Sequence, residues 1–350
     1  MKSWFRTFPV GRALTIALGL AIVGWAATKL DWRLIGQQLA GASLPAELAM
    51  ALAWLAVLFI RPVRLLMLVR KMAPDINGGY WPIWSSNTIA MATNSILPLR
   101  AGDLTMAFVL RRSIGISAAR AYSVVLVDRF FDFVTVIVIF VSMLSLAPTV
   151  ASWAHELRVT LLAALVALAA GLWVIIALRA YWIALVDRLL SGLPPPRSER
   201  WRARVRDLFA GLEQIDSLGA VVPIALLSVG LWAMTAVSYW FGAIAVWPEV
   251  SAAAAAFAVA AVALSFIVPV APGGVGVFHG AVVLSLALFK VPLAPALAFA
   301  LVAHAFQLGS VLLLGALAII RQGISVRSLL APEAASAERG RAAEIWHKSR

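Results

Sequence analysis

Cysteine is absent from this chain of 350 residues, and charged residues make up only 13% of it. The absence of cysteine excludes disulfides, thiolate metal sites and cysteine nucleophiles. The scarcity of charge excludes an ordinary soluble domain, in which about a quarter of the residues are charged. Hydrophobic residues account for 63% of the chain, and the mean hydropathy is +0.94. Apolar runs that cross a bilayer, about 20 residues each, explain that excess. We therefore predict an all-α, polytopic membrane protein.

Acidic residues are the scarcer of the two charged classes: 16 stand against 29 basic residues, which gives a net charge of +13. No basic motif lies in a recognisable nucleic-acid-binding fold, so we expect no nucleic-acid partner. In membrane proteins, Lys and Arg accumulate in cytoplasmic loops and attract anionic headgroups. Only Lys29, Arg33, Arg158 and Lys290 fall on the predicted outer side. We therefore predict a bacterial inner (plasma) membrane protein with both termini cytoplasmic and an anionic phospholipid surface as a partner.

The apolar runs predict about six full transmembrane helices and two re-entrant hairpins, each hairpin broken by Pro or Gly. The predicted spans are 13–27, 46–69, 118–147, 160–178, 220–246 and 295–320, and the hairpins are 84–110 and 252–289. The order helix, helix, hairpin, helix occurs twice, and the second copy starts on the opposite side of the membrane. This is the pattern of an inverted-topology repeat, inferred here from hydropathy and not from residue identity between the halves.

The domain organisation follows from the same pattern. We predict a single transmembrane domain over residues 1–320, with halves of about 1–150 and 151–320. Residues 179–219 are polar and Arg-rich and contain three consecutive prolines, so we predict a cytoplasmic loop with one amphipathic helix at about 199–215. The polar residues 321–350 are predicted to be a poorly ordered cytoplasmic tail.

The second break, around Gly273 and Gly274, interrupts the most apolar third of the chain. Proline removes a backbone donor, and glycine adopts backbone angles that a helix cannot use. At membrane depth the amide groups freed by such a break must face protein or a water-filled cavity, so the break predicts a site. His279 follows it directly, and His304 lies with Gln307 on one face of the last helix. These histidines are candidates for substrate binding or for structural hydrogen bonds.

The first break contains Asn94, Arg100 and Asp103. Arg100 offers a planar fork of donors that suits a phosphate. Asp103 is expected to pair with Arg100 or to cap the half-helix that begins at Leu104, whose free amides also favour an anion. The alternative is an ordinary loop arginine beside a helix cap.

A third group of candidates, Asp128, Arg129 and Asp132, lies inside a long apolar run. Asp128 and Asp132 share one helix face, and Arg129 is spaced to pair with Asp132. Facing lipid, three charges would be costly, so they must face the bundle, water or one another. A structural ion-pair network and a functional site remain alternatives.

No motif for covalent or cofactor chemistry accompanies these residues. The sequence has no serine elbow, phosphate-binding lysine loop, paired aspartates of a glycosyltransferase or metal-ligand spacing among its four histidines. We therefore expect no cofactor, no metal and no enzymatic activity.

Three motifs carry a resemblance to a known family. They are Pro-Gly-Gly-Val-Gly-Val-Phe at 272–278, Leu-Pro-Leu-Arg-Ala-Gly-Asp at 97–103 and Val-Asp-Arg-Phe-Phe-Asp at 127–132. In this order they resemble the lysylphosphatidylglycerol synthase transmembrane region family over about 11–321. The family includes the flippase domain of the multiple peptide resistance factor and smaller stand-alone proteins. It often has Glu where this chain has His279, so a carboxylate role does not carry over. We expect the lipid-translocating part without the aminoacyl-transfer domain.

We therefore predict a lipid transporter that binds and translocates a membrane lipid with an anionic, phosphate-bearing headgroup. The broken helices would hold the headgroup while the acyl chains stay in the bilayer. The main alternative is a membrane enzyme acting on polyprenyl-phosphate, hopanoid or glycolipid intermediates. Its carboxylates would have to come from Asp103, Asp128 and Asp132. A third alternative is an accessory subunit of such an enzyme.

Overall fold

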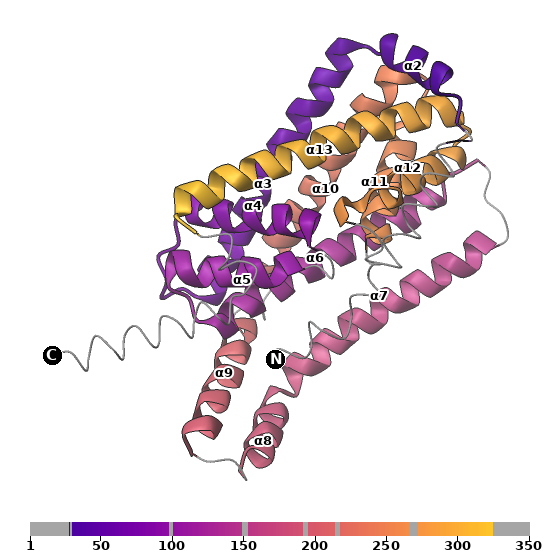
Figure 1. Cartoon of the computed structure of the whole chain (residues 1–350). Helices are drawn as coiled ribbons and strands as arrows, with labels where there is room; N and C mark the ends of the chain where they lie inside the picture. Colours follow the sequence, from indigo (N-terminus) through magenta and orange to yellow (C-terminus); the bar gives the residue numbers. More distant parts are fainter. Residues whose placement is uncertain are drawn as a thin grey trace.

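A computed structural model describes residues 28, 30–97, 101–148, 153–191, 195–213, 218–266 and 272–324. Within these ranges the chain forms twelve α-helices, α2 to α13, and one short 3-10 turn, η1, with no strand (Figure 1). The predicted all-α class is therefore confirmed. The predicted first span at 13–27 and the tail at 325–350 lie outside the described residues.

The described helices divide between the two halves of the chain. The first half contains α2 (Trp32–Ala40), α3 (Leu44–Met72), α4 (Tyr80–Ile96), α5 (Ala101–Ile114) and α6 (Ala118–Leu144). The second half contains α7 (Trp153–Ala177), α8 (Arg179–Leu189), α9 (Pro195–Glu213), α10 (Leu218–Val246), α11 (Ala252–Ser265), η1 (Pro272–Gly274), α12 (Val277–Ala287) and α13 (Leu293–Gln322).

Several helices begin and end at capping residues. The Ser117 side chain accepts a hydrogen bond from the Arg120 amide at the start of α6. Ser251 caps α11 in the same way through the Ala254 amide. Gly323, with φ of 57°, ends α13 in the left-handed conformation that glycine adopts at low cost. These caps fix the starts of α6 and α11 and the end of α13.

Three of the described helices are long and apolar enough to cross a membrane: Leu44–Met72, Gly219–Val246 and Leu293–Gln322. Large apolar side chains stay exposed on them, including Leu52, Leu226 and Leu313. Such surfaces would promote aggregation in water but match the hydrocarbon of a bilayer. The protein is therefore a multi-pass membrane protein.

Two short hairpins lie between the long helices. α4 packs against α5, α11 packs against α12, and α3 packs against α10. The long α13 runs across the bundle against α4 (Figure 1), and α6 packs against α11. The C-terminal end of α4 contacts η1, where a Cβ added to Gly273 would lie 3.7 Å from the Ser95 carbonyl oxygen. The two breaks thus meet inside the bundle.

Four helix contacts within the first half have counterparts in the second half. The α3–α4, α4–α5, α5–α6 and α3–α6 contacts correspond to α10–α11, α11–α12, α12–α13 and α10–α13. The contact between α6 and α11 corresponds to the contact between α13 and α4. Both halves therefore follow one packing plan.

Two segments differ from their predictions. The segment between the predicted spans 13–27 and 46–69 contains the helix α2, which packs against α13. The predicted loop at 179–219 contains the helix predicted at about 199–215, which is α9, and also a second helix, α8; the two lie side by side at one end of the bundle (Figure 1). α9 begins earlier than predicted, at Pro195, because proline is well tolerated in the first turn of a helix. Its apolar residues Phe209 and Leu212 pack into the core beside α6, so this pair is attached to the bundle.

Candidate functional site

Six charged side chains meet where α3 crosses α6, and we call them the ion network. They are Arg61 and Arg64 from α3, Asp103 from α5, and Asp128, Arg129 and Asp132 from α6. Three arginines face three aspartates, so the formal charge of the network is zero. A charge-balanced group is the form in which ionised side chains persist inside an apolar bundle.

Arg64 forms the floor of the ion network, with a side chain that is 0% exposed. Its Nη2 lies 2.7 Å from Asp128 Oδ1 and 2.9 Å from Asp132 Oδ1. Its Nη1 donates to Ser228 Oγ at 3.0 Å, and Asp132 also accepts from Trp232 Nε1 at 3.1 Å. Because α10 supplies these two polar partners, the floor links α3, α6 and α10.

Three side chains of the ion network are partly exposed, and we call them its rim. The side chains of Arg61, Arg129 and Asp103 are 16%, 21% and 22% exposed. Arg129 pairs through Nη1 with Asp132 at 3.1 Å and through Nη2 with Asp128 at 3.3 Å, while its Nε lies 3.3 Å from Asp103 Oδ1. Arg61 pairs with Asp132. In the described part of the chain, three buried atoms of the rim make no well-aligned hydrogen bond: Arg61 Nε, Arg129 Nε and Asp103 Oδ1. The hydrogen-bonding capacity of the rim is therefore not fully used.

The sequence predicted the α6 part of the ion network. Asp128 and Asp132 do share a face, because both contact Arg64, and Arg129 does pair with Asp132. Asp103 contacts Arg129, because the first turn of α5 packs against α6, and it lies inside α5, which begins at Ala101 and not at Leu104 as predicted. Arg100 lies outside the described residues.

The two α3 arginines were missed because they were assigned to the cytoplasmic end of a helix predicted to stop at residue 69. α3 continues to Met72, and Arg64 is fully buried. The signal was their spacing of three residues within an apolar run, which places Arg61 and Arg64 on one helix face.

Asn94 closes the first hairpin. Its Oδ1 accepts a hydrogen bond from the Gly102 amide at 2.7 Å, which joins the end of α4 to the start of α5. A Cβ on Gly102 would collide with the Ala90 carbonyl oxygen and with the Asn94 side chain. Glycine at 102 therefore permits the close approach of the two helices, and Asn94 has a structural role at the break.

The second break needs its glycines for their backbone angles. Gly273, Gly274 and Gly276 have φ of 66°, 70° and 84°, which side-chain-bearing residues rarely adopt. A Cβ on Gly274 would also collide with the Phe266 ring. The predicted departure from helical geometry at Gly273 and Gly274 is confirmed.

Four side chains around the second break form what we call the histidine cluster: Tyr239, His279, His304 and Gln307. His304 Nε2 lies 2.8 Å from the Gly273 carbonyl oxygen, and His279 Nδ1 accepts from the Gly276 amide at 3.4 Å. The two imidazole centroids are 4.9 Å apart. One nitrogen of each histidine therefore holds the glycine-rich turn in place.

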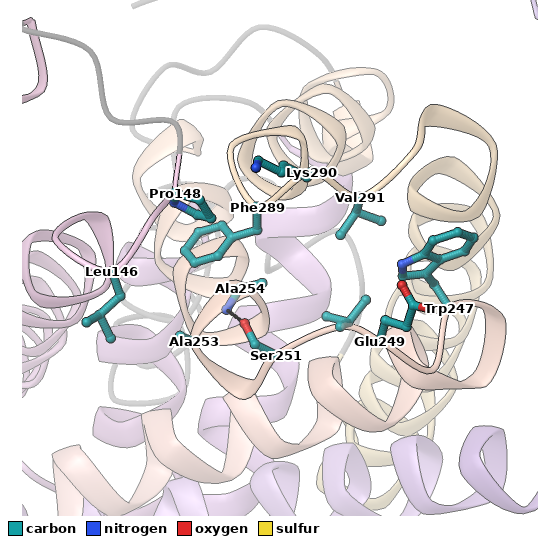
Figure 2. Close-up of a pocket in the computed structure, with 11 residues that line it drawn as sticks. Leu146, Pro148, Trp247, Glu249, Ser251, Ala253, Ala254, Phe289, Lys290 and Val291 are labelled. Atoms are coloured by element: carbon teal, nitrogen blue, oxygen red, sulfur yellow. Dashed lines mark hydrogen bonds between the residues drawn. The ribbon is translucent and has the colours of Figure 1, made fainter.

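A separate cavity of about 300 Å³ lies at the end of α6, beside the α10–α11 and α12–α13 connections (Figure 2). Glu249 and Lys290 line it, and Ser251 caps α11 at its wall. None of the residues predicted for the site lines this cavity.

A comparison with family models finds one match that covers most of the chain. The family model described as "Lysylphosphatidylglycerol synthase TM region" matches residues 12–315. The chain belongs to this family. No curated protein and no solved structure matches it. Membership in the lysylphosphatidylglycerol synthase TM region family supports a membrane protein related to lipid handling, with the ion network and the second break inside the matched region.

Proposed function

We propose that this protein binds and translocates a membrane lipid with an anionic, phosphate-bearing headgroup. The observation that carries the proposal is the ion network, which combines a buried floor with a partly exposed rim beside the first break. A purely structural network would gain from full pairing, whereas in this rim the Nε atoms of Arg61 and Arg129 make no well-aligned hydrogen bond.

The rim favours exchange of one anion for another. Asp103 is the most exposed carboxylate of the ion network, and its contact with Arg129 at 3.3 Å lacks good hydrogen-bond geometry. A phosphate that approaches the rim would replace Asp103 at Arg129, where it would meet Nε, a donor that makes no well-aligned hydrogen bond with Asp103. Guanidinium groups suit this exchange because their planar fork matches phosphate oxygens. Arg100, in the preceding break, is proposed as a further phosphate contact.

The surroundings of the rim favour a lipid over a free anion. Leu104, directly after Asp103, is 61% exposed, and Ile96, close to Asn94, is 60% exposed. A molecule that places its charge at the rim can therefore lay acyl chains along adjacent apolar helix surfaces. This arrangement separates charge from hydrocarbon as a phospholipid does.

The architecture proposed for this function has about six spans and two re-entrant hairpins in inverted orientation. The shared packing plan of the two halves and the meeting of their breaks support it. Paired broken helices at a repeat interface are where transporters place their substrates. The proposed location is the bacterial inner membrane, with both termini cytoplasmic.

The enzyme alternative needs a carboxylate that is available for proton transfer or nucleophilic attack. Each of the three candidate carboxylates is paired with an arginine, and Asp132 contacts all three arginines. Ion pairing favours the charged form of a carboxylate and opposes its use as an acid. The geometry therefore favours binding of a headgroup over catalysis by these carboxylates.

The test is translocation of a fluorescent phosphatidic acid in vesicles that contain the purified protein. Arg129→Gln and Arg100→Gln should each slow it by about 10- to 100-fold if they remove charged hydrogen bonds worth about 1.5–3 kcal/mol. Arg129→Lys and Arg100→Lys keep the charge but lose the fork, so their losses should be smaller. Arg70→Gln, at the exposed end of α3, is the matched control.

Thermal unfolding of the same samples separates function from folding. A folded Arg129→Gln protein with the wild-type rate would place the site elsewhere. An inactive wild-type protein that still binds phosphatidic acid would support the accessory-subunit alternative.

A further inference from the structure

The two longest matching helices of the halves, α6 and α13, can be aligned from their first residues. Six residues buried in α6 then fall on six residues buried in α13. The pairs are Ala121 and Ala296, Ser123 and Ala298, Val124 and Phe299, Val125 and Ala300, Asp128 and Ala303, and Val136 and Val311. The correspondence of buried positions indicates that the packing plan extends to single residues.

This alignment equates members of the ion network with members of the histidine cluster. Arg129 and His304 are the twelfth residues of α6 and α13, and Asp132 and Gln307 are the fifteenth. Asp103 and His279 are the third residues of α5 and α12, which follow the two breaks. The chemistry differs between the halves, but the positions agree.

The contacts agree as well. The pairing of Asp103 with Arg129 corresponds to the ring contact of His279 with His304. The pairing of Arg64 with Asp132 corresponds to an interaction between the Tyr239 and Gln307 side chains. Arg64 lies eight residues before the end of α3, and Tyr239 lies seven before the end of α10.

The sequences at the breaks also share a pattern that hydropathy alone did not show. Residues 96–102 read Ile-Leu-Pro-Leu-Arg-Ala-Gly, and residues 267–273 read Ile-Val-Pro-Val-Ala-Pro-Gly. Isoleucine, proline and glycine recur at the same spacing, with aliphatic residues on both sides of the proline. The halves therefore share residue identity at their most constrained point.

We propose that the histidine cluster is a second headgroup site, the counterpart of the ion network, and that it binds an uncharged hydroxyl group of the lipid headgroup. The proposal rests on the function proposed above and narrows its substrate to lipids that carry a hydroxyl beyond the phosphate.

The hydrogen bonds of the two histidines define what the site accepts. A carbonyl only accepts, so a neutral His304 carries its proton on Nε2 and leaves Nδ1 as an acceptor. His279 accepts at Nδ1, so its Nε2 carries a proton and donates. Neither remaining nitrogen has a hydrogen-bond partner within the described ranges. A hydroxyl group both donates and accepts, so it matches the free donor of His279 and the free acceptor of His304.

The neighbours of the histidine cluster exclude a phosphate at this position. Phe278 stacks on His304, with centroids 4.6 Å apart, and Tyr239 packs against Phe278 and Phe299. No arginine or lysine side chain pairs with this cluster in the described segments, in contrast to the ion network. Without a positive charge, an apolar site of this kind favours a neutral hydrogen-bonding group over an anion.

The experiment compares two lipids with identical acyl chains. Phosphatidic acid has a phosphate alone, and phosphatidylinositol adds a ring of hydroxyl groups. Each is added to the purified protein in detergent, and the shift in unfolding temperature reports binding. We expect phosphatidylinositol to raise the unfolding temperature of the wild-type protein more than phosphatidic acid does.

Two conservative substitutions remove only the nitrogens that face the ligand. His279→Asn keeps an acceptor in the place of Nδ1, and His304→Gln keeps a donor in the place of Nε2. Without lipid, the double variant should unfold at the wild-type temperature. With lipid, it should lose the preference for phosphatidylinositol and keep the response to phosphatidic acid. Equal shifts for both lipids in the wild-type protein, or an unchanged preference in the variant, would overturn the proposal.

A charge exchange tests the structural equivalence without any lipid. His304→Arg alone should lower the unfolding temperature, by about 3 °C or more, because it buries an unpaired charge. Adding His279→Asp should recover most of the loss, since the pair then reproduces Asp103 and Arg129. No recovery would show that the two positions are not equivalent. If the lipid preference and the recovery by charge exchange are both observed but the wild-type protein does not translocate lipid, only the function proposed above is refuted.

Discussion

Removal of Arg64 should be the most damaging single change in the ion network. The side chain is 0% exposed and contacts Asp128, Asp132 and Ser228. Arg64→Met keeps much of the apolar volume but leaves the network with one net negative charge, because two arginines then face three aspartates. Breaking a buried ion pair by removing one partner costs about 3–5 kcal/mol. We expect a loss of unfolding free energy in that range.

A double-mutant cycle identifies the cause. Asp128→Asn in the Arg64→Met background restores charge balance, so the double variant should be more stable than the sum of the two single losses predicts. Contacting residues couple by about 0.5–3 kcal/mol, and the buried pair should fall in the upper part of that range. The assay is equilibrium unfolding in detergent micelles, with Arg70→Met as the exposed control on the same helix. A coupling energy near zero, or a loss for Arg64→Met no larger than for Arg70→Met, would refute the reasoning.

Three further predictions follow from local geometry. Gly274→Ala should destabilise the protein by about 1–3 kcal/mol or prevent its folding, because the φ of Gly274 is 70°. The control Gly280→Ala, whose Cβ would meet no atom within 4 Å, should be neutral or slightly stabilising. Equal unfolding temperatures for the two variants would contradict this prediction. Asn94→Ala should cost about 1 kcal/mol through loss of its hydrogen bond to a backbone amide, measured in the same way, and an unchanged stability would remove its assigned role. In intact cells a membrane-impermeant thiol reagent should label Glu249→Cys and leave Ala203→Cys unlabelled, and the reverse pattern would invert the predicted orientation.

The sequence predicted the parts of the site that depend on local spacing. Asp128, Arg129 and Asp132 lie within one turn of helix, so their shared face and their pairing follow from helical geometry alone. The glycines of the second break were predictable because positive φ angles are almost confined to glycine.

The remainder depends on how helices cross. Arg64 acquires its partners only where α3 meets α6, and no local pattern specifies that crossing. Asp103 contacts Arg129 because the first turn of α5 lies against α6. The correspondence between Asp103 and His279 emerged only when the helix bounds gave both residues the same position after a break.

The zero net charge of the ion network has an electrical consequence. Moving one elementary charge across a membrane potential of 100 mV involves about 2.3 kcal/mol of work. A network of three arginines and three aspartates that shifts as a unit carries no gating charge, so reorientation of the unloaded protein would be insensitive to voltage. With an anionic headgroup bound at the rim, the only net charge that moves would be the charge of the headgroup. In the proposed cycle the membrane potential would therefore act on the loaded step and set the direction in which the lipid accumulates.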